Sequence, residues 1–219
     1  MKASATPSIA GRPPPLGGPL GRLVAAAYGS IITRRNRRFD AGRGVVRLDR
    51  PVISVGNLSV GGTGKTPMVL HLTRVLLAVG RRPCIAMRGY GAAPGESDEA
   101  LSYQRDLPGI PIVAQPNRTD GLLELFAERG DEVDCVVLDD GFQHRQIARD
   151  FDIVLIDATR PPSADSLLPA GWLREPMQSL QRAHAVVVTH AEAVTRTDAI
   201  AVETHLWEYV PKAVTAVCR

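Results

Sequence analysis

The chain has 219 residues, of which 44% are hydrophobic, 22% charged and 5% aromatic. This balance is ordinary for a globular domain with one sizeable core, and it excludes collagen-like, disordered and disulfide-scaffold proteins. The net charge of +3 is unevenly divided, because residues 1–50 carry ten Lys and Arg against two Asp, or +8, whereas residues 51–219 carry −5. A basic N-terminal segment (the head, residues 1–50) before an acidic remainder (the body, residues 51–219) does not indicate a nucleic-acid-binding protein. It suggests instead that the head meets an anionic surface.

The cysteines indicate a reducing compartment. Cys84, Cys135 and Cys218 are odd in number, lie far apart and include no Cys-x-x-Cys pair of the kind that holds a metal. Cys84 and Cys135 lie within apolar runs, so we expect buried, reduced thiols in a cytoplasmic protein.

Residues 1–38 are predicted to form a flexible terminus and then a segment at the membrane interface. Residues 1–19 are rich in Pro, Gly and Ala, whereas residues 20–33 are mostly apolar and precede four arginines: Arg34, Arg35, Arg37 and Arg38. A helix of about 14 residues reaches ~21 Å, less than the ~30 Å hydrocarbon core. The charge follows the apolar stretch, which argues against a signal peptide. Two arrangements stay open: a helix in the membrane interface with its arginines on anionic headgroups, and a surface helix packed on the body.

Residues 39–219 are predicted to form one α/β domain. Short apolar runs alternate with helical stretches, which predicts a mostly parallel sheet with helices on both faces. The expected strands cover residues 52–55, 84–87, 133–138, 153–156, 185–188 and 213–217, and the expected helices include residues 67–79 and 121–129. Ligands of such sheets bind at the carboxyl ends of the strands. A glycine-rich turn, Asp139-Asp140 and Asp157 all follow strands, so we expect them to share one edge.

A phosphate-binding loop is the strongest motif in the chain. Residues 61–66 read Gly-Gly-Thr-Gly-Lys-Thr, follow a predicted strand and open a predicted helix, as such a loop requires. Glycines let backbone N–H groups approach phosphate oxygens, and the helix N-terminus adds a partial positive charge. Lys65 is expected to reach the β- and γ-phosphates of a nucleotide, and Thr66 to ligate Mg²⁺. The single departure is Ser59, which stands where the usual pattern has glycine.

Two aspartates are the expected partners of this loop. An apolar strand that ends in Asp supplies the carboxylate that holds Mg²⁺ in phosphate-loop proteins, and either Asp139 or Asp140 can do this. His144 follows, and a lone histidine after a strand is more often structural than catalytic. Three polar loops are expected at the same edge: residues 88–91, 97–99 and 168–176. Within them, Asp98 and Arg174 have the chemistry of a general base and of a cation near a transferred phosphate.

Together these motifs resemble the tetraacyldisaccharide 4'-kinase family, the lipid A kinases. The resemblance runs from about residue 16 to the end, with matching order and spacing, and rests on residues 54–67, 88–91, 98–99, 139–144 and 168–176. It implies phosphorylation of the 4'-hydroxyl of a lipid A disaccharide precursor, using ATP and Mg²⁺, at the cytoplasmic face of the bacterial inner membrane. It also implies a fold of the P-loop NTPase kind. The apolar and arginine-rich head resembles that family's membrane-associated N-terminus.

The resemblance also implies a role for each motif residue. Asp98 is expected to accept the proton of the sugar hydroxyl, and His144 and Arg174 to lie at the phosphate or lipid site. The metal or its waters are expected to be held by Thr66, Glu99, Asp139 and Asp140. ATP is expected to contact eight consecutive residues: Ser59, Val60, Gly61, Gly62, Thr63, Gly64, Lys65 and Thr66.

The family pattern continues beyond the part that this sequence matches. It includes a histidine that pairs with the catalytic aspartate in a Phe-Pro-Asp-His-His-like segment, and the surroundings of His184, His190 and His205 do not match it. We therefore expect ATP binding to need only the given residues, and phosphate transfer to be weak without the missing segment.

Two other kinds of phosphate-loop protein are alternatives. A nucleotide-switch ATPase of the chromosome- and septum-partitioning type shares the glycine spacing, but it carries a lysine before the first of these glycines, where this chain has Val60. A metallochaperone GTPase would carry a Cys- or His-rich metal motif and a guanine-reading Asn-Lys-x-Asp segment. The sequence contains neither.

Overall fold

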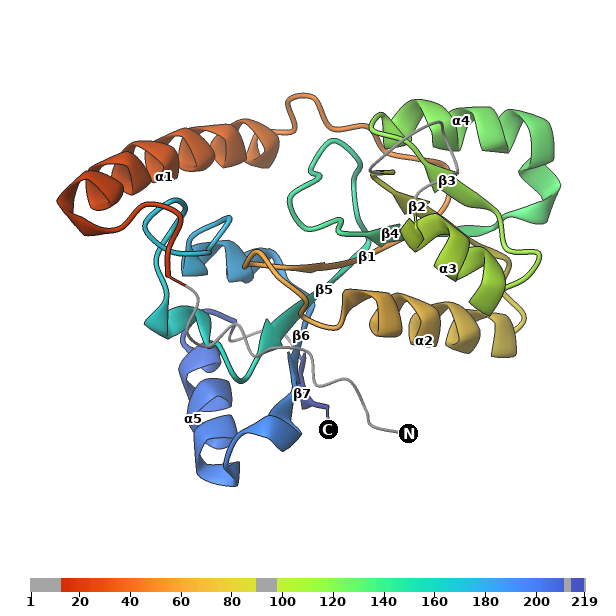
Figure 1. Cartoon of the computed structure of the whole chain (residues 1–219). Helices are drawn as coiled ribbons and strands as arrows, with labels where there is room; N and C mark the ends of the chain where they lie inside the picture. The colour runs from red at the N-terminus through yellow and green to blue at the C-terminus, as the bar shows by residue number, and fades with distance from the viewer. Residues whose placement is uncertain (1–12, 90–97, 211–213, 219) are drawn as a thin grey trace.

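A seven-stranded parallel sheet forms the centre of the computed structural model, which describes residues 13–89, 98–210 and 214–218 (Figure 1). Within these residues the strand order is β3-β2-β4-β1-β5-β6-β7, and every pairing is parallel. The strands are β1 (Val52–Asn57), β2 (Pro83–Met87), β3 (Ile112–Ala114), β4 (Cys135–Asp139), β5 (Phe151–Asp157), β6 (Ala185–Thr189) and β7 (Val214–Val217). The predicted α/β class with a mostly parallel sheet is confirmed.

Helices cover both faces of the sheet. They are α1 (Gly18–Asp40), α2 (Lys65–Ala78), α3 (Asp98–Asp106), α4 (Arg118–Arg129) and α5 (Arg196–Trp207), with short 3₁₀ turns η1 (Gly130–Glu132), η2 (Pro162–Ala164), η3 (Met177–Arg182) and η4 (Ala191–Ala193). Alternate residues of β4 face opposite sides, as the period of a strand requires. Val137 packs in the cluster with α2 and α3, whereas Val136 and Leu138 pack in the cluster with α4. A third cluster joins β5 and β6 to α5 and η3.

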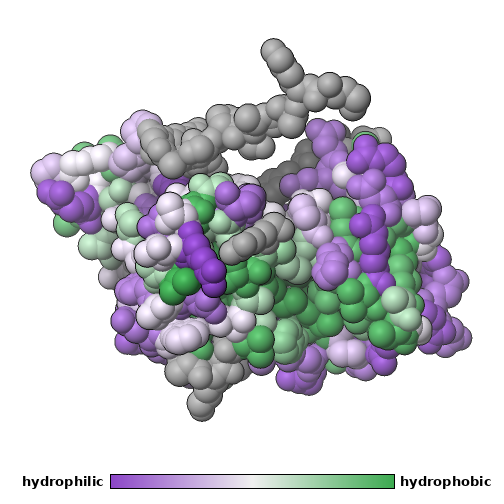
Figure 2. All heavy atoms as spheres, turned by 90° about the horizontal axis from the view of Figure 1, so that it is seen from below, coloured by the Kyte–Doolittle hydropathy of each residue, from purple (hydrophilic) through white to green (hydrophobic). Residues whose placement is uncertain are grey.

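One side of the core is only partly covered. Figure 2 views the molecule from below, the side where α2 lies in Figure 1, and apolar surface gathers there between polar patches. Ile153 of β5 and Val187 of β6 pack against the cluster that includes α2, yet both remain partly exposed. The edge of the sheet at the carboxyl ends of the strands differs, because mostly polar residues surround it.

Several elements differ from the expectation. Asp98 and Glu99 were expected in a loop, but they open α3, where two acids in the first turn suit the helix dipole. The short strand β3 and the helix α5 were not predicted. α5 begins with a Thr195 cap, whose hydroxyl accepts a hydrogen bond from the backbone N–H of Asp198 at 3.1 Å. Its buried side chains follow at helical spacing: Ala199, Val202 and Leu206.

The N-terminal helix is longer than the apolar stretch predicted. α1 has 23 residues and ends at Asp40, so the arginines lie on its last turns and the boundary expected after residue 38 falls within it. Four residues of α1 are buried against the rest of the chain: Gly21, Ala25, Ile32 and Asn36. The other side exposes Leu20, Leu23 and Ile31. No helix among the described residues is long and apolar enough to cross a membrane.

The burial expected for two of the cysteines is confirmed. Cys84 and Cys135 are free and buried in the sheet, whereas Cys218, which does not lie in such an apolar run, is free and exposed. Burial raises the pKa of Cys84 to about 12, which keeps its thiol protonated and unreactive.

Candidate active site

The glycine-rich turn joins β1 to α2 and is held from both sides. Gly64 has a φ of 81°, a left-handed conformation that suits glycine, and α2 begins at the next residue. Thr189 at the end of β6 donates its hydroxyl hydrogen to the carbonyl of Thr63 at 3.1 Å. Asn57 donates to the carbonyl of Ser59 at 2.8 Å. The turn therefore has the strand–loop–helix geometry of a phosphate-binding loop.

Two cavities, each of about 560 Å³, lie side by side at this edge. The first is lined by residues 61–67, together with Met87, Glu99, Asp139 and His190. The second is lined by Tyr28, Ile32 and Arg35 of α1 and by Arg118, Gln143 and His144, among others. Both cavities share the same three residues: Arg88, Asp140 and Arg174. A phosphate bound at the loop would therefore face a ligand in the second cavity across these shared side chains.

Asp140 stands between two cations. Its Oδ1 lies 3.6 Å from Lys65 Nζ, and its Oδ2 accepts a hydrogen bond from Arg174 Nη1 at 2.7 Å. Burial by itself would raise the pKa of Asp140, but the charges of Lys65 and Arg174 outweigh it and the pKa is lowered. The backbone of Asp140 has a φ of 49°, unusual for a residue other than glycine. The carboxylate is thus ionised and aimed at the boundary of the two cavities.

Asp139 is held by a tyrosine that sequence reasoning missed. Tyr103 of α3 is fully buried, and its hydroxyl donates to Asp139 Oδ2 at 2.9 Å. The other oxygen, Oδ1, is buried and has no hydrogen-bond partner within the described residues. Burial raises the pKa of Asp139, and the neighbouring charge of Asp140 adds to this, against the hydrogen bond from Tyr103. The sequence offers only a weak signal for this contact, a tyrosine in a mostly polar helix.

The residues expected to hold Mg²⁺ are brought together at the first cavity. Thr66, Glu99, Asp139 and Asp140 all line it. Along the described parts of the chain, no group of three or more His, Cys, Asp and Glu could hold a metal ion. Mg²⁺ commonly uses only one or two carboxylates and completes its shell with phosphate oxygens and water, so the donor set fits this ion. Asp139 Oδ1 and Asp140 Oδ1, both buried without a hydrogen-bond partner among the described residues, are the available ligands.

His144 lies in the second cavity, away from the phosphate loop. Burial, together with the charges of Arg118 and Arg149, lowers its pKa to about 4, so the imidazole is neutral at pH 7. Its Nε2 is buried and has no hydrogen-bond partner in the described residues. Arg118, another residue that sequence reasoning missed, is 3% exposed, and it donates to the carbonyl of Asp140 at 3.3 Å.

The 168–176 segment reaches the site by pairing with the chain before the glycine turn. The N–H of Val60 donates to the carbonyl of Trp172 at 2.8 Å, and the N–H of Arg174 donates to the carbonyl of Leu58 at 2.7 Å. These bonds place the Arg174 side chain beside Asp140. Pairing of this kind depends on tertiary structure, and residue spacing in the sequence does not reveal it.

A family model described as tetraacyldisaccharide-1-P 4'-kinase, LpxK, matches residues 19–217. The chain belongs to the LpxK family. Its relatives include the tetraacyldisaccharide 4'-kinases of Geobacter sulfurreducens, 43% identical over 187 residues, and of Anaeromyxobacter sp. strain K, 40% identical over 204 residues. These matches cover 76% and 83% of this chain, but 52% and 53% of the relatives. The chain thus spans about half the length of the curated relatives that it matches.

Solved structures agree with the family. LpxK from Aquifex aeolicus, solved in complex with ATP, has a TM-score of 0.68 and 35% identity, covering 88% of this chain and 61% of that one. The cell division protein FtsY from Thermotoga maritima, at a TM-score of 0.50 and 14% identity, shares the fold alone. The P-loop NTPase-like fold and the family resemblance are therefore confirmed.

The predicted site residues of this LpxK-family chain fall into three groups. The first cavity gathers residues 61–66 with Glu99, Asp139, Asp140 and Arg174, whereas His144 lines only the second. Val60 lines the second cavity, and Ser59 pairs with Leu173. Asp98 is exposed at the start of α3, and neither cavity has it among its described lining residues. Of the predicted 88–91 loop, residues 90 and 91 lie outside the described part of the chain, as does residue 97.

Proposed function

We propose that this chain transfers the γ-phosphate of ATP to the 4'-hydroxyl of a tetraacyldisaccharide 1-phosphate, a lipid A precursor. One observation carries the proposal: two adjacent cavities, one built on a phosphate loop, share Arg88, Asp140 and Arg174 at their boundary. Transfer between two bound substrates requires such a shared boundary, because the reacting atoms must meet there. Membership of the LpxK family supplies the identity of the two substrates.

The loop side of the boundary would hold ATP. Backbone N–H groups of residues 61–66 and the N-terminus of α2 suit the phosphates, whereas the N–H of Val60 is bonded to Trp172. Lys65 would neutralise charge on the β- and γ-phosphates. Thr66, Glu99, Asp139 and Asp140 would hold Mg²⁺, directly or through water. The ion would supply charge neutralisation at the phosphates.

The other side would hold the acceptor. Asp98 opens α3 outside the described lining of both cavities, and its assignment rests on the family resemblance. We assign it as the base that takes the proton of the 4'-hydroxyl, while the new O–P bond forms and the bond from the γ-phosphorus to ADP breaks. Arg174 would stabilise the charge on the transferred group, because its guanidinium stands at the boundary of the two cavities. A neutral His144 can accept or donate one hydrogen bond to the sugar or its phosphate.

The N-terminal segment would bring the enzyme to its lipid substrate. We propose that residues 1–38 act at the cytoplasmic face of the inner membrane and residues 39–219 as the kinase core. α1 exposes Leu20 and Leu23 to the outside and lines the acceptor cavity with Tyr28 and Arg35. One helix thus serves both the membrane surface and the acceptor site, which suits an acceptor with acyl chains.

Radiolabelled ATP and the tetraacyl disaccharide 1-phosphate test the proposal directly. We expect the lipid to become labelled, and we expect ATP to be consumed only when the lipid is present. Asp98→Asn should reduce the transfer to the lipid by roughly 100-fold or more. An ATP hydrolysis rate that is the same with and without the lipid, and no label on the lipid, would contradict the proposal. It would favour the nucleotide-switch alternative.

A further inference from the structure

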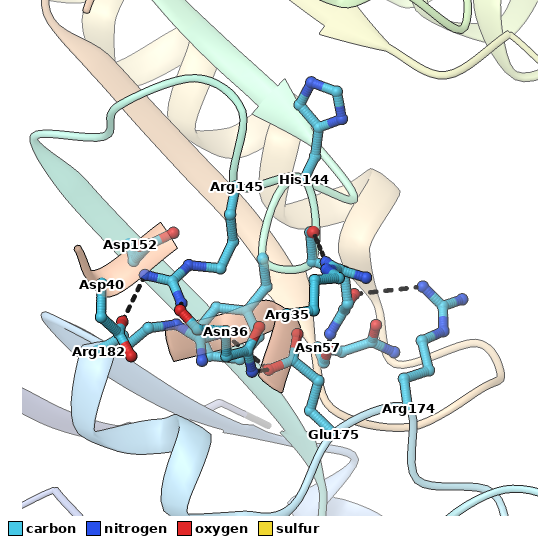
Figure 3. A network of polar contacts seen from close by, with 12 residues as sticks. Arg35, Asn36, Asp40, Asn57, His144, Arg145, Asp152, Arg174, Glu175 and Arg182 are labelled. Carbon is cyan, nitrogen blue, oxygen red and sulfur yellow. Dashed lines mark hydrogen bonds and ion pairs between the residues drawn. The ribbon is translucent and has the colours of Figure 1, made fainter. Parts of the chain in front are cut away.

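Glu175 is a buried carboxylate that the proposed mechanism does not use. Its side chain is 0% exposed. Its Oε2 accepts hydrogen bonds from Asn36 Nδ2 at 2.8 Å and from Arg182 Nη2 at 3.0 Å (Figure 3). Its Oε1 is buried and finds no hydrogen-bond partner in the described residues. Removing a carboxylate from water is costly, and an apolar side chain would serve packing equally well. The position therefore points to a task beyond packing.

The neighbouring residue is Arg174, whose backbone is fixed on both sides. Its N–H donates to the carbonyl of Leu58 at 2.7 Å, and its carbonyl accepts from the hydroxyl of Tyr28 at 2.9 Å. In Figure 3 the Glu175 side chain reaches toward Asn36 on α1, whereas the Arg174 side chain extends in a different direction. An anchor at Glu175 therefore restricts the direction of the Arg174 side chain.

The second partner of Glu175 connects to the turn after Asp140. The Arg182 guanidinium lies 4.3 Å from the centre of the Phe142 ring. The next residue, Gln143, donates to the carbonyl of Asn57 at 2.8 Å, and its backbone carbonyl accepts from Arg35 of α1. Glu175 thus ties together α1, η3 and the turn that carries Asp140.

We propose that Glu175 is a positioning residue for Arg174. Its carboxylate holds the 174–175 backbone against α1 and η3, so that Arg174 meets Asp140 at the boundary of the two cavities. The catalytic consequence rests on the proposed function, because Arg174 acts there on the transferred phosphate. The structural consequence, an ordered Arg174 guanidinium, does not depend on it.

Steady-state kinetics of Glu175→Gln tests the catalytic consequence. We expect kcat to fall about 10- to 100-fold, since small displacements of a positioned group have effects of this size, while KM for ATP stays within about twofold. In an Arg174→Gln background the same substitution should add no further loss, because residues that act through one another are not additive. A wild-type kcat, or losses that multiply, would overturn the proposal.

Asp134→Asn is the matched control. Asp134 is a partly buried carboxylate, and it lies 3.4 Å from Arg81 and 3.8 Å from Arg82, with its side chain 26% exposed. Its carboxylate contacts within the described residues involve neither Arg174, Glu175 nor the turn after Asp140. We expect it to lower stability and leave kcat per folded molecule unchanged. Since Glu175→Gln leaves Arg182 without its carboxylate, a Glu175→Gln/Arg182→Gln variant removes both charges and covers the case of poor folding.

Guanidinium ¹⁵N NMR of the full chain tests the structural consequence without any activity. The bond to Asp140 restricts rotation of the Arg174 guanidinium, and Arg174→Lys identifies its signals by their loss. We expect the signals of the restricted guanidinium to average in Glu175→Gln and to stay separate in Asp134→Asn. Restricted signals in Glu175→Gln would overturn the proposal. Absence of lipid-dependent transfer by the wild type would overturn only the proposed function.

Discussion

Lys65 lines the nucleotide cavity, and its Nζ lies 3.6 Å from Oδ1 of Asp140 at the boundary of the two cavities. We expect Lys65→Ala to abolish phosphate transfer, because loss of this charge in the transition state costs on the order of several kcal/mol. Transfer of radiolabel to the lipid is the measurement. Arg74→Ala, on the exposed side of the same helix, is the control and should leave transfer intact. Equal turnover of the Lys65 variant and the wild type would refute the assignment of the loop.

Tyr103 orients a carboxylate that we assign to Mg²⁺. Without its hydroxyl, Asp139 Oδ2 loses its donor, and both oxygens of this buried group lack a partner among the described residues. We expect Tyr103→Phe to weaken the apparent affinity for Mg²⁺ by about 10- to 100-fold, the range found for residues behind metal ligands. Titration of ATP binding against Mg²⁺ measures this. Tyr209→Phe, a tyrosine of the α5 end, is the control, and equal titration curves for all three proteins would exclude the role.

His144 predicts a pH dependence of stability. Burial lowers its folded-state pKa to about 4, whereas an unfolded histidine titrates near ~6.5. The unfolded chain therefore binds the proton first, so this contribution to stability is complete above ~6.5 and is lost as the pH falls toward 4. We expect wild type to lose more stability than His144→Gln between pH 7 and pH 4.5, as judged by urea midpoints. His71→Gln, at an exposed position of α2, should follow the wild type. Parallel curves for wild type and His144→Gln would contradict this account.

At the scale of elements, α1 has an apolar outer side and, toward its C-terminal end, four arginines that differ in their exposure to solvent. Arg35 donates to the carbonyl of Gln143 and is partly buried, whereas Arg34, Arg37 and Arg38 are exposed. We expect replacement of these three exposed arginines by Gln to weaken binding to anionic vesicles by ~3 kcal/mol, at about 1 kcal/mol each. Vesicle co-sedimentation, with and without high salt, measures the loss.

The control for this experiment removes three exposed arginines from other helices: Arg74, Arg105 and Arg196. It changes the net charge equally and should leave vesicle binding nearly unchanged. If the two triple variants bind vesicles equally well, the arginines of α1 have no special role. Net charge or the apolar side of α1 then governs attachment.

The sheet was readable from sequence because its buried strands are apolar runs with sharp ends. The lengths of helices were less readable. α1 extends past its apolar stretch because arginine is a good helix former, so a change from apolar to basic residues does not mark a helix end. The phosphate loop and Asp139-Asp140 could be placed because strand ends share an edge. Tyr103, Arg118 and Glu175 could not, since their importance arises from contacts between segments far apart in sequence.

At the scale of the whole molecule, all the contacts proposed for the nucleotide lie on one rim of one sheet. We therefore expect the 219-residue chain to bind ATP–Mg²⁺ without any lipid. Ligand at 100 times its dissociation constant should stabilise the fold by about 2.7 kcal/mol. Thermal unfolding with ATP and Mg²⁺, compared with ATP and EDTA, measures this. Identical melting temperatures in both conditions, and in the protein alone, would contradict it.

The order of strands in the sheet has a consequence for synthesis on the ribosome. β1 lies between β4 and β5, with Val52 opposite Val136 and Ile53 opposite Phe151. The glycine-rich loop therefore emerges during translation long before either neighbour of its strand exists. Thr189, which supports the loop through Thr63, emerges later still. Nucleotide can stabilise the nascent chain only after β4, β5 and Thr189 have been synthesised, and until then the apolar β1 and α2 have no partner sheet and are expected to bind chaperones.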